Sequence, residues 1–68
     1  MMPRRISKMR LLRESRNLSQ VDVAVLSGVS AATVYRAERN GQVRASTRQR
    51  IARVFGIPPE VLFTGDVR

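Results

Sequence analysis

Arginine is the residue whose abundance and spacing in this sequence point to a specific chemistry. Twelve of the thirteen basic residues are arginine. The guanidinium group donates paired hydrogen bonds to phosphate oxygens, so this bias favours a nucleic acid as the partner. The bases form two groups, six between Arg4 and Arg16 and six between Arg36 and Arg53, with none in residues 17–35. Solubility alone explains a net charge of +8, but it does not explain this clustering.

The sequence lacks the residue patterns that catalysis, metal binding or cofactor binding would need. There is no cysteine and no histidine, the five acidic residues are scattered, and neither a glycine-rich phosphate loop nor metal-ligand spacing occurs. We therefore expect a protein that is not an enzyme and that holds no metal and no cofactor. No apolar run approaches the roughly 20 residues of a membrane-spanning helix. We expect no membrane partner and a cytoplasmic location, associated with the nucleoid through DNA.

The pattern of apolar residues predicts an all-α protein. Residues 1–68 are enough for one small domain, and we expect its core within about residues 4–63. β-Branched residues nowhere alternate with polar ones over the length of a strand. Apolar residues at helical spacing predict five short helices instead, near residues 4–15, 20–27, 31–39, 46–55 and 59–63. Ile6, Met9 and Leu12 would share the inner face of the first helix.

Capping residues mark the ends of these helices. Ser19 precedes the second helix and forms a weak capping box with Asp22, and Gly28 ends that helix. Ser30 is the predicted N-cap of the third helix.

The fourth helix has its own start signal. Ser46 and Gln49 form the pattern of a capping box, and Gly56 ends the helix. Asn40-Gly41 ends the third helix, since both residues tolerate the left-handed conformation. The same dipeptide is also a hairpin signal, but neither flank reads as a strand.

Residues 19–39 have the pattern of a helix-turn-helix unit. Two helices that cross steeply need a small residue at their closest approach, and Ala24 stands there. The turn between them needs positive φ, which Gly28 adopts without strain. The apolar positions beneath the unit are Val23, Val29, Val34 and Ala37.

The stretches MRLLRESRNLSQ, VAVLSGVSAATVYRAERNG and IARVFGIPPEVLF resemble the Cro/phage-repressor helix-turn-helix family, often called XRE-like. The resemblance implies a compact five-helix bundle of the lambda-repressor-like type that binds double-stranded DNA as a homodimer. It leaves no room for a second domain that senses a ligand, so we expect no small-molecule effector.

The resemblance also implies roles for individual residues. The third helix would lie in the major groove, with base contacts from Ala31, Ala32, Thr33, Tyr35 and Arg36. The phosphate contacts would come from Gln20, Ser30, Arg39 and Arg44. Gln20 would also brace the third helix, and the loop 40–45 would cross the DNA backbone. Arg13 and Glu38 match a buried ion pair in the family, and the dimer surface would involve Ile57, Val61, Leu62 and Phe63.

Three departures from the family pattern affect these expectations. Ala31 and Ala32 replace larger polar residues and offer only methyl groups to the bases, so direct readout would rest on Arg36. The glycine after the third helix comes one position late, at Gly41. Arg48 replaces a common leucine and would enlarge the basic face, together with the residues Arg50 and Arg53.

Several functions remain open on the sequence alone. The first hypothesis is a dimeric repressor that regulates its own gene. The alternatives are an antitoxin or a controller of restriction–modification genes, in which a second protein is the main partner. Val21, Val25 and Leu26 are apolar where the family is usually polar, and they are a candidate surface for such a partner.

Overall fold

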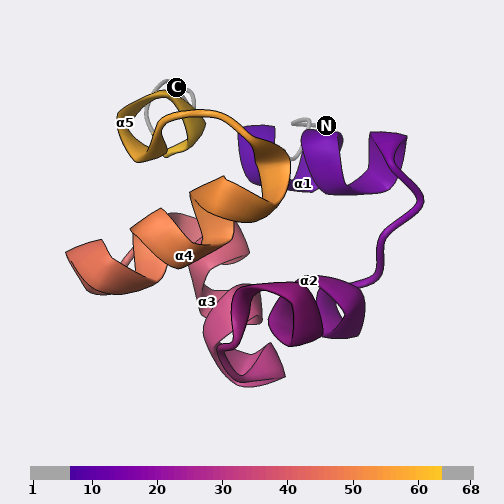
Figure 1. Ribbon diagram of the computed structural model, residues 1–68, viewed down its shortest axis with the longest axis horizontal. Helices are drawn as coiled ribbons and strands as arrows, with labels where there is room; N and C mark the ends of the chain where they lie inside the picture. Colours follow the sequence, from indigo (N-terminus) through magenta and orange to yellow (C-terminus); the bar gives the residue numbers. More distant parts are fainter. Residues whose placement is uncertain (1–6, 64–68) are drawn as a thin grey trace, which may run out of the picture.

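Residues 7–63, which the computed structural model describes, form five α-helices and no β-strand (Figure 1). The helices are α1 (Lys8–Ser15), α2 (Gln20–Ser27), α3 (Ala31–Asn40), α4 (Ala45–Phe55) and α5 (Pro59–Leu62). The all-α prediction is therefore confirmed. Asn40 is the last residue of α3, so no hairpin forms at Asn40-Gly41.

The start of α1 differs from the prediction. The helix begins at Lys8 instead of near Arg4, and Ser7 is its N-cap. The Ser7 hydroxyl oxygen accepts a hydrogen bond from the backbone N–H of Arg10 at 3.1 Å, which satisfies a donor that the first turn leaves free. Ile6, expected on the inner face of this helix, lies outside the described residues.

The start of α4 also differs, and the predicted capping box is wrong. Arg44 occupies the N-cap position and makes no side-chain cap. Ser46 is already the second residue of the helix, two positions beyond the N-cap. Its hydroxyl therefore cannot cap the free backbone N–H groups of the first turn. The remaining helix ends agree with the predicted ones to within one residue.

The core lies between the inner faces of all five helices. Its buried members are Met9, Val23, Ala24, Val34, Ala37, Ile51, Ala52, Phe55 and Leu62. In Figure 1, α1 and α5 lie along the upper side of the molecule and α2 along the lower side, while α4 lies between them and α3 runs behind α4. The helix α3 is thus held through one side only, which leaves its other side for a partner.

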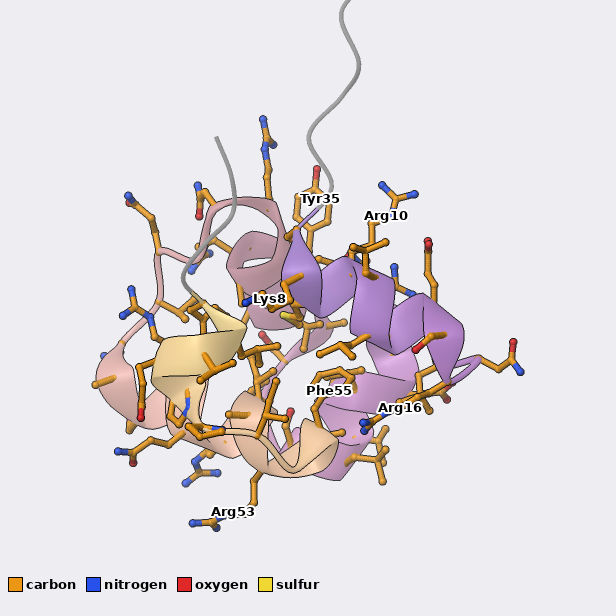
Figure 2. All side chains as sticks on the ribbon, turned by 90° about the horizontal axis from the view of Figure 1, so that it is seen from above. Lys8, Arg10, Arg16, Tyr35, Arg53 and Phe55 are labelled. Carbon is orange, nitrogen blue, oxygen red and sulfur yellow. The ribbon has the colours of Figure 1, made fainter. Side chains whose placement is uncertain are left out.

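A cation–π contact ties the turn after α1 to α4. The Arg16 guanidinium lies over the ring of Phe55, with its carbon 5.3 Å from the ring centre (Figure 2). Such contacts contribute roughly 0.5–1 kcal/mol at exposed sites. Arg16 therefore covers one side of the core instead of adding a free charge to the surface.

Candidate nucleic-acid interface

The helices α2 and α3 form the helix-turn-helix unit. At its start, the Ser19 hydroxyl accepts from the N–H of Asp22 at 3.0 Å, and the Asp22 carboxylate accepts from the N–H of Ser19 at 2.8 Å. This is the capping box that the sequence predicts. The hydrogen bonds from the Ser19 backbone and hydroxyl lower the pKa of Asp22 below its ordinary value.

Gly28 makes the turn between the two helices. Its φ is +76°, and its N–H donates to the carbonyl of Ala24 at 2.9 Å. A Cβ at this position would lie 3.4 Å from the Arg50 guanidinium, an ordinary contact, so an L side chain would be strained by the positive φ and not by lack of space. Ser30 then caps α3 by accepting from the N–H of Thr33 at 3.1 Å.

The recognition face, defined here as the exposed side chains Ala31, Ala32, Tyr35 and Arg36, lies on the outer side of α3. The opposite side of the helix carries Val34, Ala37 and Glu38, all buried. The two sets alternate at helical spacing, as expected for a helix packed on one side. Figure 2 shows Tyr35 projecting outward from α3.

Glu38 joins α3 to two other helices. Its carboxylate accepts from Arg13 Nε at 2.6 Å and Nη2 at 3.1 Å, and from Gln20 Nε2 at 2.9 Å. The Glu38 side chain is only 7% exposed and that of Arg13 12%, so the ion pair is largely shielded from water. The Arg13 guanidinium also donates to the carbonyl of Leu18 at 2.8 Å. Its hydrogen bonds to Glu38 raise the pKa of Arg13.

The geometry around the expected base contacts varies. Ala31, Ala32 and Arg36 are exposed, and within residues 7–63 the Arg36 guanidinium has no hydrogen bond or ion pair. Thr33 is half-buried, and its hydroxyl lies 2.8 Å from that of Ser30. The Tyr35 hydroxyl accepts a long hydrogen bond, 3.4 Å, from Arg39.

The residues expected to contact phosphate stand at or next to the ends of helices. Gln20 opens α2, where its amide donates to Glu38, so it braces α3 through that residue. Ser30 and Arg39 stand at the two ends of α3, and both are exposed. Arg44 is the exposed N-cap of α4.

Arg48 has a different position from the one expected. Its Nε and Nη2 donate to the carbonyl of Gly41 at 3.3 and 2.8 Å, and its guanidinium lies over the Phe63 ring, 5.7 Å from the centre. The expectation that Arg48 enlarges the basic face is therefore wrong, since the side chain is half-buried. It fastens the loop after α3 to the end of α5.

One of the four residues expected at the dimer surface is buried in the core. Leu62 is 2% exposed and belongs to the core, so it is not available to a partner. Val61 is 45% exposed, while Ile57 and Phe63 are half-buried against the core. The backbone carbonyl of Val61 accepts from Lys8 Nζ at 2.9 Å, which ties α5 to α1.

The described part of the chain offers neither a candidate metal site nor a candidate membrane span. Residues 7–63 contain no group of three or more acidic, histidine or cysteine side chains that could hold a metal ion. None of the helices there has the length and apolar character needed to cross a membrane.

Comparison with known proteins agrees with the geometry. A helix-turn-helix family model matches residues 9–62, which include all of α2, α3, α4 and α5. A search among curated proteins gave no match. The matched region spans most of the chain and includes the unit built from α2 and α3. This chain therefore belongs to the XRE-like, lambda-repressor-type helix-turn-helix family of DNA-binding transcription regulators.

Proposed function

We propose that this chain is a sequence-specific transcription regulator, a homodimer that represses its own gene by placing α3 in the major groove of double-stranded DNA. The observation that carries the proposal is the distribution of charge on α3. Arg36 and Arg39 point outward, whereas the only acid of the helix, Glu38, is buried and paired with Arg13. The surface that would meet DNA is therefore positive without a compensating acid.

Base readout is assigned to the recognition face and the neighbouring Thr33. A guanidinium can donate two hydrogen bonds to guanine, so Arg36 is the main reader. Ala31 and Ala32 let the helix approach closely and offer methyl groups to thymine. Tyr35 would add a hydrogen-bonding hydroxyl, and the Thr33 hydroxyl can act only by sharing its bond with Ser30.

Phosphate contacts are assigned to the residues that border the recognition face, namely Gln20, Ser30, Arg39 and Arg44. Helix N-termini favour anions, and Gln20 and Ser30 stand at two such ends. The Gln20 amide uses one N–H on Glu38 and has a second for a phosphate. The remaining contacts are charge-assisted and come from the two arginines.

The proposed dimer pairs the surface around Val61, with Ile57 and Phe63 at its border. Pairing gives a small module two half-sites, about 34–36 Å apart, and therefore a longer recognised sequence.

The test is binding to the DNA upstream of the protein's own gene, with a scrambled duplex of the same composition as the control, across a series of salt concentrations. We expect the native duplex to be bound about a thousandfold more tightly, in the range of specific complexes. The logarithm of its binding constant should fall steeply with the logarithm of salt concentration. Equal and weak binding to both duplexes would contradict autoregulation, and an absence of salt dependence would contradict DNA binding itself.

A further inference from the structure

The helix α2 exposes apolar side chains on the side that faces away from the core. Val21, Val25 and Leu26 are 59%, 75% and 61% exposed. Val21 and Val25 are four residues apart and therefore share one stripe of the helix, whereas Leu26 lies about 100° around the helix from Val25, on the side that lines the neighbouring groove. Scattered apolar side chains are common on protein surfaces, but neighbours on one helix form a patch, and patches of this kind mark interaction sites.

A groove continues this patch onto α4. It has a volume of about 620 Å³ and runs between the end of α2 and α4. Leu26 and Val54 supply its apolar lining, Ser46 and Gln49 its polar lining, and Arg50 and Arg53 its charge. The Arg50 guanidinium lies close to Gly28, so it reaches from α4 to the end of α2.

Within residues 7–63, the two groove arginines belong with Arg36 and Arg44 to the arginines whose side chains have no partner. Arg10 and Arg13 pair with acids, Arg16 lies over Phe55, and Arg48 binds a carbonyl. Within residues 7–63, Arg50 and Arg53 have neither a hydrogen bond nor an ion pair, and no acidic side chain lines the groove. A ligand that brings carboxylates next to an apolar surface would complement both features.

The groove lies away from the recognition face. Figure 2 shows Tyr35 and Arg53 projecting from opposite sides of the molecule. A second copy of the chain fits the groove poorly, because its net charge is +8. Three of its five acids are also engaged, since Glu14 pairs with Arg10, Asp22 caps α2 and Glu38 is buried.

We propose that the patch of Val21, Val25 and Leu26, together with the groove beside it, is a docking surface for an acidic amphipathic helix of another protein. The apolar ridge of that helix would cover the patch and Val54, and its carboxylates would meet Arg50 and Arg53. Helices commonly bind in this way, through anchors three and four residues apart. The proposal concerns a different face from the one assigned to DNA and does not depend on DNA binding.

The test uses the full chain, labelled with nitrogen-15, and a synthetic helical peptide of about 14 residues, which is four turns long. The peptide has leucine spaced three and four residues apart and glutamate on both flanks. Titration followed by amide chemical shifts should give saturable changes centred on residues 21–26 and 50–54. A second peptide with serine in place of leucine keeps the charge and should bind at least about tenfold more weakly, because it lacks the apolar ridge.

Charge exchange makes the test specific. The double variant Arg50→Glu/Arg53→Glu should bind the glutamate peptide at least about tenfold more weakly. It should also gain affinity for a peptide with lysine in place of glutamate. The matched control is Arg36→Glu/Arg39→Glu, which changes the net charge equally on the recognition face and should leave peptide affinity within about twofold. If the double variant does not fold, judged by its amide spectrum, Arg53→Glu alone serves, since that side chain is exposed and has no hydrogen bond or ion pair in the described part of the chain.

Four outcomes would overturn the proposal. Shifts centred on α3 would show that the peptide binds the recognition face. Equal binding of the leucine and serine peptides would show attraction by charge alone. A loss of DNA affinity in Arg53→Glu as large as in the control variant would assign the groove to phosphate. Peptide-free dimers that Leu26→Ser dissociates in sedimentation would assign the patch to a second copy.

Discussion

At the scale of single residues, the Glu38 carboxylate separates structural charge from charge available to DNA. It faces inward and accepts hydrogen bonds from Arg13 on α1 and Gln20 on α2. Its neighbours Arg36 and Arg39 face outward. The charges of Arg36, Glu38 and Arg39 alternate in sign along α3. The helix thus has a paired, neutral charge on its inner side and positive charge on its outer side.

Replacement of Glu38 by alanine should destabilise the domain strongly. It leaves the Arg13 guanidinium largely buried without its partner, and breaking a buried pair in this way costs about 3–5 kcal/mol. Urea denaturation measures the change. Glu14→Ala is the control, because it removes an exposed pair with Arg10 and only a long contact, 3.8 Å, with Arg13, and it should cost at most about 0.5 kcal/mol. Equal stability of the two variants would contradict a structural role for Glu38.

Arg36→Ala should mainly reduce the discrimination between DNA sequences. Its effect on the affinity common to all duplexes should be smaller. Loss of a paired contact to guanine removes about 1–3 kcal/mol of discrimination at one base pair. Arg39→Ala removes the same charge but should weaken binding to all sequences alike and reduce the salt slope by about 1. Competition binding with single-base operator variants distinguishes the two. Loss of discrimination in Arg39→Ala alone would reverse the assignments.

At the scale of helices, the sequence predicts most ends that are determined locally, but it misses the local N-cap at Ser7 as well as the start of α4. Ser19, Gly28 and Ser30 act through neighbours within four residues, so their roles are legible in the sequence. The start of α4 is not legible in this way. The capping-box pattern at Ser46 competes there with the contacts of the loop 40–45. Arg48 reaches back to Gly41 and forward to Phe63, and only the fold brings these residues together.

The capping box of α2 should make stability depend on acid pH. Hydrogen bonds from Ser19 lower the pKa of Asp22 in the folded protein. The contribution of Asp22 is therefore complete above the ordinary aspartate pKa, about 3.9, and is lost as pH falls through the lower, folded value. Asp22→Asn should be less stable than the natural protein at pH 7, and the difference should shrink in denaturation experiments below that ordinary pKa. A difference that is constant with pH would contradict the carboxylate's role.

Arg48→Ala should release the loop between α3 and α4. The variant loses two hydrogen bonds from a charged group to Gly41, and a bond of this kind contributes about 1.5–3 kcal/mol. Urea denaturation should show a loss of that order. Arg53→Ala is the matched control, because within residues 7–63 this exposed side chain has no hydrogen bond or ion pair to lose, and the change in stability should be less than about 0.5 kcal/mol. Equal stability of the two variants would contradict the contact.

At the scale of the whole molecule, the two basic blocks of the sequence do not become two basic surfaces. Among the described residues of the first group, Arg10 pairs with Glu14, Arg13 pairs with the buried Glu38 and Arg16 lies over Phe55. In the second group, Arg36 lies on the recognition face, Arg50 and Arg53 line the groove on the opposite side, and Arg48 binds the carbonyl of Gly41. Composition and clustering therefore predict an affinity for nucleic acid, but residues adjacent in the chain can face opposite directions, and only the fold assigns each charge to a surface.

The proposed dimer makes a prediction about the spacing of half-sites. Two modules on one face of DNA need half-sites about one helical turn apart, so inserting five base pairs should abolish cooperative binding. Val61→Glu should have the same effect on the unaltered operator, because it places a charge at the exposed centre of the proposed surface. Gel-shift titration measures both. Unchanged cooperativity in both experiments would contradict the dimer.

The recognition face of α3 also has a consequence for the divergence of this protein. Its side chains contribute nothing to the core, because the helix is held entirely through Val34, Ala37 and Glu38 on its other side. If α3 reads DNA as proposed, substitutions at Ala31, Ala32 or Arg36 change the preferred operator at little cost in folding free energy. Two of these positions are short alanines that a longer polar side chain can replace. The target sequence of such a chain can thus be rewritten, by selection or by design, while its scaffold stays the same.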